Sequence, residues 1–187
     1  MAEVQALEMS NNKLQENISQ LASNVRLLVL DVDGIMTDGK LYFSNSGEES
    51  KAFNTMDGLG LKLLQKSGIQ VALITGRTSE IVQKRAESLG ISIIHQGRDD
   101  KKNVLDGILE TLAMDYNDVA YAGDDLPDLA CIKAAKLGIT VPNGHFLAQE
   151  AADAITSRKG GEGAVREICD WILQAQDTFN DAVSPFQ

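Results

Sequence analysis

Short apolar runs alternate with amphipathic segments along most of the chain, and this alternation constrains the fold more than any other feature. The first run, LLVLDV at 27–32, is typical of a strand buried on both faces of a parallel sheet. Four further runs follow, each separated from the next by a segment of helical periodicity: IQVALIT (69–75), ISIIHQ (91–96), DVAYAG (118–123) and LGITV (137–141). This order predicts a doubly wound, Rossmann-like α/β fold with a parallel sheet and right-handed crossovers.

Three segments add to this pattern. Apolar residues recur at helical spacing near the start and predict a surface helix over about 3–23. Residues 40–54 predict a β-hairpin around the turn Asn45-Ser46-Gly47. A last amphipathic helix is expected over about 162–175. The hairpin is large enough for a flap but too short for a cap domain, so we expect one domain over 1–187.

Polar side chains gather where the predicted strands end. Asp31 and Asp33 end the first strand, Thr75 ends the second, Lys101 begins the helix after the third, and Asp124 ends the fourth. Ligands of open α/β sheets bind at the carboxyl ends of the strands, so these side chains are expected to meet at one edge.

Helix capping is the structural alternative for such acids. It accounts for Asp125 or Asp128, because aspartates often begin helices. It does not account for Asp31, because an unpaired carboxylate at the end of a buried strand is costly. Mg²⁺ would offset that cost, since it prefers oxygen ligands and is commonly held by carboxylates together with substrate phosphate.

These residue types suit phosphoryl transfer. An ionised Asp31 could attack phosphorus and form an aspartyl-phosphate. Asp33 points the same way, and it could protonate the leaving oxygen and later activate a water molecule. Thr75 and Lys101 would offset charge on the phosphoryl oxygens. A receiver-like phospho-accepting switch uses a similar set, but the acid two positions after Asp31 favours an enzyme with turnover.

Composition narrows the classes of partner that the chain could bind. The formal net charge of -10 argues against a nucleic-acid partner and against an anionic membrane surface. No window approaches the roughly 20 apolar residues of a membrane span. Cys131 and Cys169 form no CxxC pair and are expected to be buried thiols in a reducing compartment. With no signal peptide recognised at the start, we expect a cytoplasmic protein.

The quoted motifs carry a family resemblance. DVDGIMTDG (31–39), ITGR (74–77), Lys101 and GDDLPD (123–128) resemble, in order, the four motifs of haloacid dehalogenase superfamily phosphatases. Over about 24–176 the chain resembles more narrowly the 3-deoxy-D-manno-octulosonate 8-phosphate phosphatases. The supporting stretches are the flap, ITGRTSEIVQKRAESLGI, YAGDDLPDLA and KGGEGAVREICDWIL.

The resemblance implies a haloacid dehalogenase-type fold without a large cap domain. It implies Mg²⁺-dependent hydrolysis of an eight-carbon sugar acid phosphate, through an aspartyl-phosphate, during lipopolysaccharide synthesis in Gram-negative bacteria. It also implies a homotetramer whose hairpins form a central barrel and whose neighbouring subunits and C-terminal tails close each site. A phosphatase for a nine-carbon sugar acid phosphate stays open as an alternative.

The resemblance also assigns roles. The metal ligands would be Asp31, the backbone carbonyl of Asp33, and Asp124. Phosphate would be held by Thr75, Gly76 and Lys101, although the adjacent Lys102 is an alternative to Lys101.

Three further residues are candidates for substrate binding. Arg77 would recognise a carboxylate or phosphate, unless it is a solvated surface arginine. Arg85 would reach a neighbouring surface or subunit. Asp57 would contact sugar hydroxyls, or it would cap a helix. The glycine-rich segment 160–163 is expected to close over the site.

Overall fold

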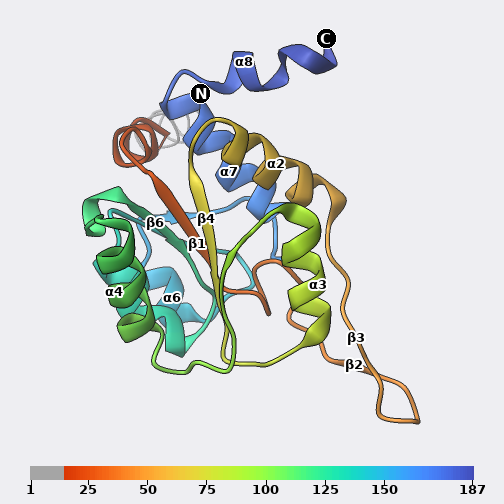
Figure 1. Cartoon of the computed structure of the whole chain (residues 1–187). Helices are drawn as coiled ribbons and strands as arrows, with labels where there is room; N and C mark the ends of the chain where they lie inside the picture. The colour runs from red at the N-terminus through yellow and green to blue at the C-terminus, as the bar shows by residue number, and fades with distance from the viewer. Residues whose placement is uncertain (1–14) are drawn as a thin grey trace, which may run out of the picture.

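A computed structural model describes residues 15–187 of the chain (Figure 1). Its centre is a parallel sheet of six strands in the order β5-β4-β1-β6-β7-β8. These strands are β1 (Leu27–Leu30), β4 (Gln70–Ile74), β5 (Ile93–His95), β6 (Val119–Ala122), β7 (Leu137–Thr140) and β8 (Ala154–Ile155). The order reverses direction at β1, which lies between β4 and β6, so the strand bearing the two acids lies at the switch point where such sheets bind ligands.

Helices cover both faces of the sheet, because successive side chains of each strand point to opposite faces. Leu28 and Leu30 belong to one apolar cluster, and Leu27 and Val29 belong to the other. The first cluster includes side chains of residues 15–22, which are helical, and of α2 (Thr55–Lys66), α3 (Glu80–Leu89) and α7 (Ala164–Ala175). The second includes side chains of α4 (Lys101–Leu112), α5 (Leu129–Ala134) and α6 (Phe146–Ala151). The doubly wound fold is thereby confirmed.

The smaller elements complete the chain. The predicted flap is a two-stranded antiparallel hairpin of β2 (Tyr42–Phe43) and β3 (Glu49–Ser50). Short 3₁₀ turns are η1 (Tyr116–Asp118), η2 (Leu126–Asp128) and η3 (Ser184–Phe186), and α8 (Phe179–Val183) lies near the end. Residues 3–14 of the predicted first helix lie outside the described residues. No helix within 15–187 has the length and apolar character needed to cross a membrane.

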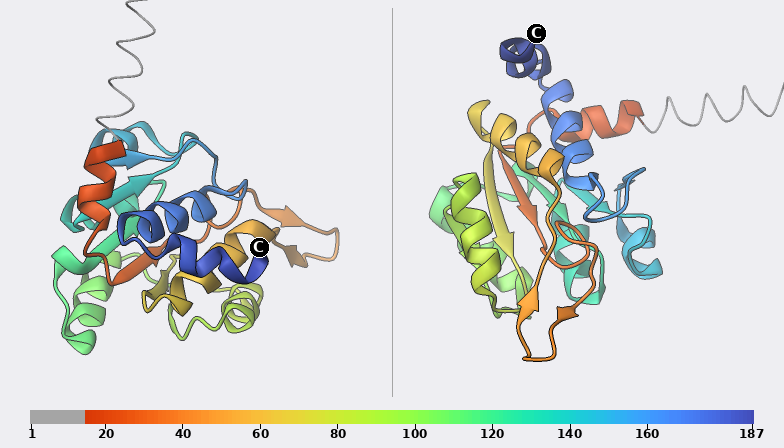
Figure 2. Two further views of the ribbon diagram at one scale, coloured as in Figure 1. Left: turned by 90° about the horizontal axis from the view of Figure 1, so that it is seen from above. Right: turned by 90° about the vertical axis from the view of Figure 1, so that its right-hand side faces the viewer.

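The hairpin and the C-terminus lie at opposite ends of the molecule. The hairpin projects beside the carboxyl ends of the strands, whereas α8 lies beyond their amino ends (Figures 1 and 2). The flap therefore neighbours the predicted site, and the C-terminal segment of the same chain does not.

The glycine-rich segment 160–163 does not form the lid that the sequence suggested. Gly160 donates its N–H to Asn143 Oδ1 at 3.1 Å, and Gly161 donates to the carbonyl of Ile35 at 3.0 Å. A Cβ on Gly160 would lie 1.7 Å from the carbonyl oxygen of Gly34. The segment thus packs against the turn that follows Asp33 and supports it.

Gly160→Ala is therefore expected to lower the free energy of unfolding by about 1–3 kcal/mol, because the added methyl group displaces that turn. Urea unfolding measures the change. Gly107→Ala is the matched control, because a Cβ at this exposed α4 position meets nothing within 4 Å. The control should be neutral or stabilising by about 0.5–1 kcal/mol. Equal stability of Gly160→Ala and wild type would contradict the supporting role.

Candidate active site

The carboxyl ends of β1, β4 and β6 open into a cavity of about 330 Å³. Its lining brings together most of the predicted site residues from separate parts of the sequence. The lining residues are Asp31, Asp33, Gly39, Thr75, Gly76, Arg77, Asp99, Lys101, Asp124, Asp125, Pro127 and Asp128.

Asp31 is tied to the cavity floor by Lys101. The Lys101 ammonium donates to Asp31 Oδ1 at 2.8 Å and to Asp128 Oδ1 at 2.7 Å. All three side chains are buried. Burial acts to lower the pKa of Lys101, but the Asp31 and Asp128 carboxylates raise it above its ordinary value, so the lysine is charged. A buried cation between two carboxylates fixes the orientation of Asp31.

Asp128 is itself held from several directions. The hydroxyl of Tyr121, a fully buried residue of β6, donates to Asp128 Oδ1 at 2.7 Å. The backbone N–H groups of Asp124 and Asp125 donate to Asp128 Oδ2 at 3.2 and 3.3 Å. Tyr121 was missed in the sequence, although a phenol within an apolar strand signals a buried hydrogen bond.

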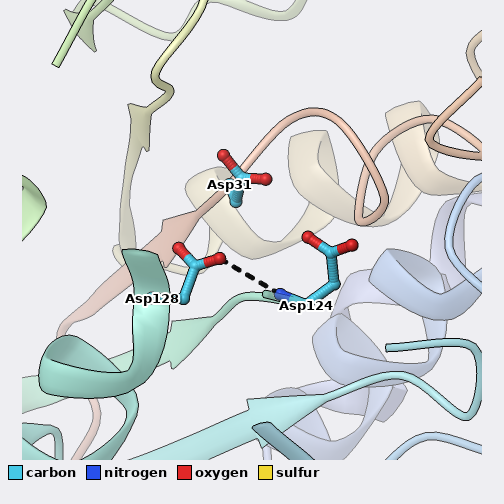
Figure 3. Close-up of side chains that lie close together, drawn as sticks. All are labelled: Asp31, Asp124 and Asp128. Atoms are coloured by element: carbon cyan, nitrogen blue, oxygen red, sulfur yellow. Dashed lines mark hydrogen bonds between the residues drawn. The ribbon is translucent and has the colours of Figure 1, made fainter. Parts of the chain in front are cut away.

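Asp124, the third acid of the site, lies against Gly34. Gly34 has a φ of +98°, and a Cβ there would lie 2.1 Å from Asp124 Oδ2, so this position suits glycine on both counts. Asp31, Asp124 and Asp128 each offer a carboxylate oxygen within 4.8 Å of the other two. Figure 3 shows the three side chains around one space, with Asp128 bound to the Asp124 N–H.

The electrostatics of this cluster suit a divalent cation. Burial, and then the nearby Asp128 charge, raise the pKa of Asp31 to about 7 and that of Asp124 to about 7. Carboxylates crowded in a buried site resist ionisation together unless a cation offsets the charge. Lys101 is the cation bound to Asp31 within the described residues. An all-oxygen site of this kind fits Mg²⁺.

Asp33 also lines the cavity, and its side chain contacts the flap. Its Oδ1 accepts a hydrogen bond from Lys51, which follows β3, and Arg77 Nε lies 3.9 Å from its Oδ2. Arg77 also donates to Glu49 Oε1 at 2.8 Å. Neither Lys51 nor Glu49 was predicted, because charged residues in a polar hairpin give no signal of burial.

Two predicted substrate contacts do not line this cavity. Asp57 is buried at the start of α2, where its Oδ1 accepts from the Arg166 N–H at 2.8 Å. Burial raises its pKa to about 6, against the opposing effects of that N–H and nearby arginines. Arg85 donates to the Asn54 carbonyl at 3.1 Å and lies over the Phe53 ring. Asn54, and not Asp57, caps α2 through its side chain.

The two adjacent lysines, Lys101 and Lys102, have different surroundings. Lys102 pairs with Asp106 at 3.0 Å on the outer surface of α4 and also contacts Tyr116, whereas Lys101 points into the cavity. Asp125 accepts a hydrogen bond from the Leu126 N–H at 2.8 Å and caps η2. This is the capping role that the sequence offered as the alternative for Asp125.

Comparisons with known proteins agree with this geometry. Residues 91–168 match the family model described as haloacid dehalogenase-like hydrolase. The chain is 46% identical, over 167 residues, to the 3-deoxy-D-manno-octulosonate 8-phosphate phosphatase of Yersinia pestis. That alignment covers 89% of each protein.

Solved structures extend the likeness to the whole fold. The Moraxella catarrhalis 3-deoxy-D-manno-octulosonate 8-phosphate phosphatase, in complex with magnesium, phosphate and KDO, superposes with a TM-score of 0.89 at 48% identity. The match covers 91% of this chain and 98% of that one. The cobalt-bound phosphatase of Haemophilus influenzae superposes with a TM-score of 0.82 at 36% identity, covering 85% of this chain and 93% of that one.

These matches confirm both the superfamily and the narrower resemblance inferred from the motifs. This chain belongs to the 3-deoxy-D-manno-octulosonate 8-phosphate phosphatase family of haloacid dehalogenase-like hydrolases.

Proposed function

We propose that the chain hydrolyses 3-deoxy-D-manno-octulosonate 8-phosphate to the free sugar acid and phosphate, with Mg²⁺ as cofactor, in lipopolysaccharide synthesis. One observation carries the proposal. Asp31, Asp33, Lys101 and Asp124 line one cavity in a chain 48% identical to a phosphatase that binds magnesium, phosphate and KDO. The family consists of hydrolases, which disfavours the receiver-like switch.

Asp31, Asp124 and the backbone carbonyl of Asp33 are the proposed Mg²⁺ ligands. When bound, the ion supplies positive charge that offsets the charge on the phosphoryl oxygens. The raised pKa values of Asp31 and Asp124 support this assignment, because both carboxylates need a counter-charge to be ionised together.

The proposed reaction has two steps. In the first, an Asp31 oxygen bonds to phosphorus while the bond from phosphorus to the sugar oxygen breaks, and Asp33 gives its proton to that oxygen. In the second, Asp33 takes a proton from water as the water oxygen bonds to phosphorus and the bond from Asp31 to phosphorus breaks. Both acids return to their starting states.

Thr75, Gly76 and Lys101 are the proposed phosphate contacts. Thr75 is buried at the end of β4 and lines the cavity, so its hydroxyl can donate to a phosphoryl oxygen. Lys101 holds Asp31 while its charge offsets that of the phosphoryl group. Arg77 is the proposed contact for a substrate anion at the mouth, where its side chain is 43% exposed. Asp57 and Arg85 lie outside this cavity, so a substrate role for them would require a neighbouring subunit.

A phosphate-release screen tests the proposed function. We expect the eight-carbon sugar acid phosphate to give the highest kcat/KM among sugar phosphates with Mg²⁺, and chelation by EDTA to abolish release. Added Mg²⁺ should restore it. A higher kcat/KM with the nine-carbon sugar acid phosphate would transfer the assignment to that substrate. Full activity in EDTA would overturn the metal requirement.

Residues 1–187 are proposed to act as one phosphatase domain within a homotetramer. The hairpin supports the assembly, because it projects from the rest of the molecule (Figure 2) and carries exposed apolar side chains. Leu41 is 49% exposed and Phe43 is 59% exposed. Apolar groups on so small a hairpin are typical of an interface. The free thiols Cys131 and Cys169 support a reducing, cytoplasmic location.

Replacing both Leu41 and Phe43 by Ser is therefore expected to convert tetramers into dimers or monomers, because the hairpins lose their apolar contact. Light scattering measures the mass. Phe146→Ser is the control, since this residue of α6 is also exposed, at 61%, but lies outside the hairpin. Tetramers that persist at micromolar concentration after the double substitution would show that the hairpin does not hold the assembly together.

A further inference from the structure

The hairpin carries a lysine that is buried against the active site. Lys51 follows β3, and its side chain is only 1% exposed, although most of the hairpin is solvent-facing. Lysine is almost never buried to this extent without a charged partner. Its partners are Asp33 Oδ1, to which it donates a hydrogen bond, and Glu49 Oε1 at 3.5 Å. The hairpin therefore reaches the site through one specific ion pair.

Lys51 is the hydrogen-bond donor to the Asp33 side chain among the described residues. The second oxygen of that carboxylate, Oδ2, is buried and has no hydrogen-bond partner within 15–187. Arg77 Nε, at 3.9 Å, is too far for a hydrogen bond. Without Lys51, the Asp33 side chain would keep only the longer ion pair with Arg77 and would accept no hydrogen bond within 15–187.

Glu49 joins this contact to Arg77, which lines the cavity. It lies 3.5 Å from Lys51 Nζ and 2.8 Å from Arg77 Nη2, so two acids and two cations alternate around the cavity mouth. Glu49 therefore gives the Lys51 ammonium a second carboxylate partner.

We propose that Lys51 is a positioning residue, which holds the Asp33 carboxyl group in the orientation that delivers its proton to the leaving oxygen. The inference rests on the proposed two-step reaction. The proton passes from Asp33 to the bridging oxygen while the bond from that oxygen to phosphorus breaks and the bond from Asp31 to phosphorus forms. Lys51 takes no part in these bonds and acts only through Asp33.

The leaving group decides how much this positioning matters. A sugar hydroxyl is a weak acid, so its oxygen leaves only when it is protonated in the transition state. p-Nitrophenolate is a far more stable anion and leaves without a proton. Since kcat/KM reports the steps up to departure of the leaving group, a misplaced Asp33 should impair the first substrate much more than the second.

Lys51→Met is therefore expected to lower kcat/KM by about 100-fold for the sugar phosphate, and by less than about fivefold for p-nitrophenyl phosphate. Lys51→Arg keeps the charge and should restore most of the loss. Lys40→Met is the matched control, because Lys40 also lies beside a carboxylate at the hairpin base but is 72% exposed. It should leave both substrates unaffected.

Each outcome decides the inference. An equal loss with both substrates would mean that Lys51 supports the site in general, and unchanged kinetics would mean that it does not act on Asp33; either result overturns the proposal. Phenyl phosphate distinguishes a failure of the Lys51 inference from a failure of the proposed function, because phenol is less acidic than p-nitrophenol. If the wild-type enzyme does not hydrolyse the sugar phosphate, the proposed function is overturned. A larger loss with phenyl than with p-nitrophenyl phosphate would still support Lys51, and equal losses would still reject it.

Discussion

Asp31→Asn is expected to abolish phosphate release, with a loss of at least about a thousandfold in kcat. A neutral amide does not attack phosphorus, and no aspartyl-phosphate can form on it. The amide oxygen can still accept the hydrogen bond from Lys101, which stays paired with Asp128 at 2.7 Å. The measurement is phosphate release by wild type and variant at saturating Mg²⁺.

Stability separates loss of chemistry from loss of structure. The folded state raises the pKa of Asp31 to about 7 from 3.8, so at neutral pH and without metal the ionised carboxylate opposes folding. Removing that charge should leave the metal-free variant at least as stable as wild type in urea. Turnover above about a thousandth of wild type in the folded variant would contradict the nucleophile.

Lys101→Met is expected to impair both activity and stability. Lys101 is buried between Asp31 and Asp128, and removing one partner from a buried charged cluster costs about 3–5 kcal/mol. Loss of its charge beside the phosphoryl group should lower kcat by at least about 100-fold. Phosphate release and urea unfolding, each with and without Mg²⁺, measure the two effects.

Lys102→Met is the matched control for this variant. Lys102 is the next residue along α4, but its ammonium pairs with Asp106 on the surface, where an ion pair contributes at most about 1 kcal/mol. We expect activity within about threefold of wild type, since surface substitutions rarely disturb a site. A larger loss of activity in Lys102→Met than in Lys101→Met would reverse the assignment of the phosphate lysine.

The cavity floor could be predicted because its residues follow directly from strand ends. Asp31 and Thr75 come immediately after β1 and β4, and Asp124 comes two residues after β6. In a parallel sheet those ends share one edge, so locating the apolar runs also located the acids. The choice between Lys101 and Lys102 was available too. Lys101 precedes the buried Leu105 by four positions, on the same face of α4.

The cavity mouth could not be predicted in the same way. Lys51 and Glu49 belong to a hairpin whose polar sequence is typical of a solvated loop, and only the tertiary fold buries Lys51 against Asp33. The expectation that 160–163 closes over the site was wrong, because these glycines pack closely against the turn at Gly34 and do not line the cavity. The elements α6, β8 and α8 were missed, since two to six residues are too few to show a period.

The central claim is that Asp31 faces both a divalent ion and the phosphoryl group, and a crystal structure with Mg²⁺ and a metal fluoride mimic of that group tests it most directly. We predict one Asp31 oxygen and one Asp124 oxygen on the ion at about 2.1 Å. The other Asp31 oxygen should lie in line with the mimic. Lys101 should contact the mimic. An Asp31 side chain turned away from the ion, or beyond hydrogen-bond distance of the mimic, would contradict the claim.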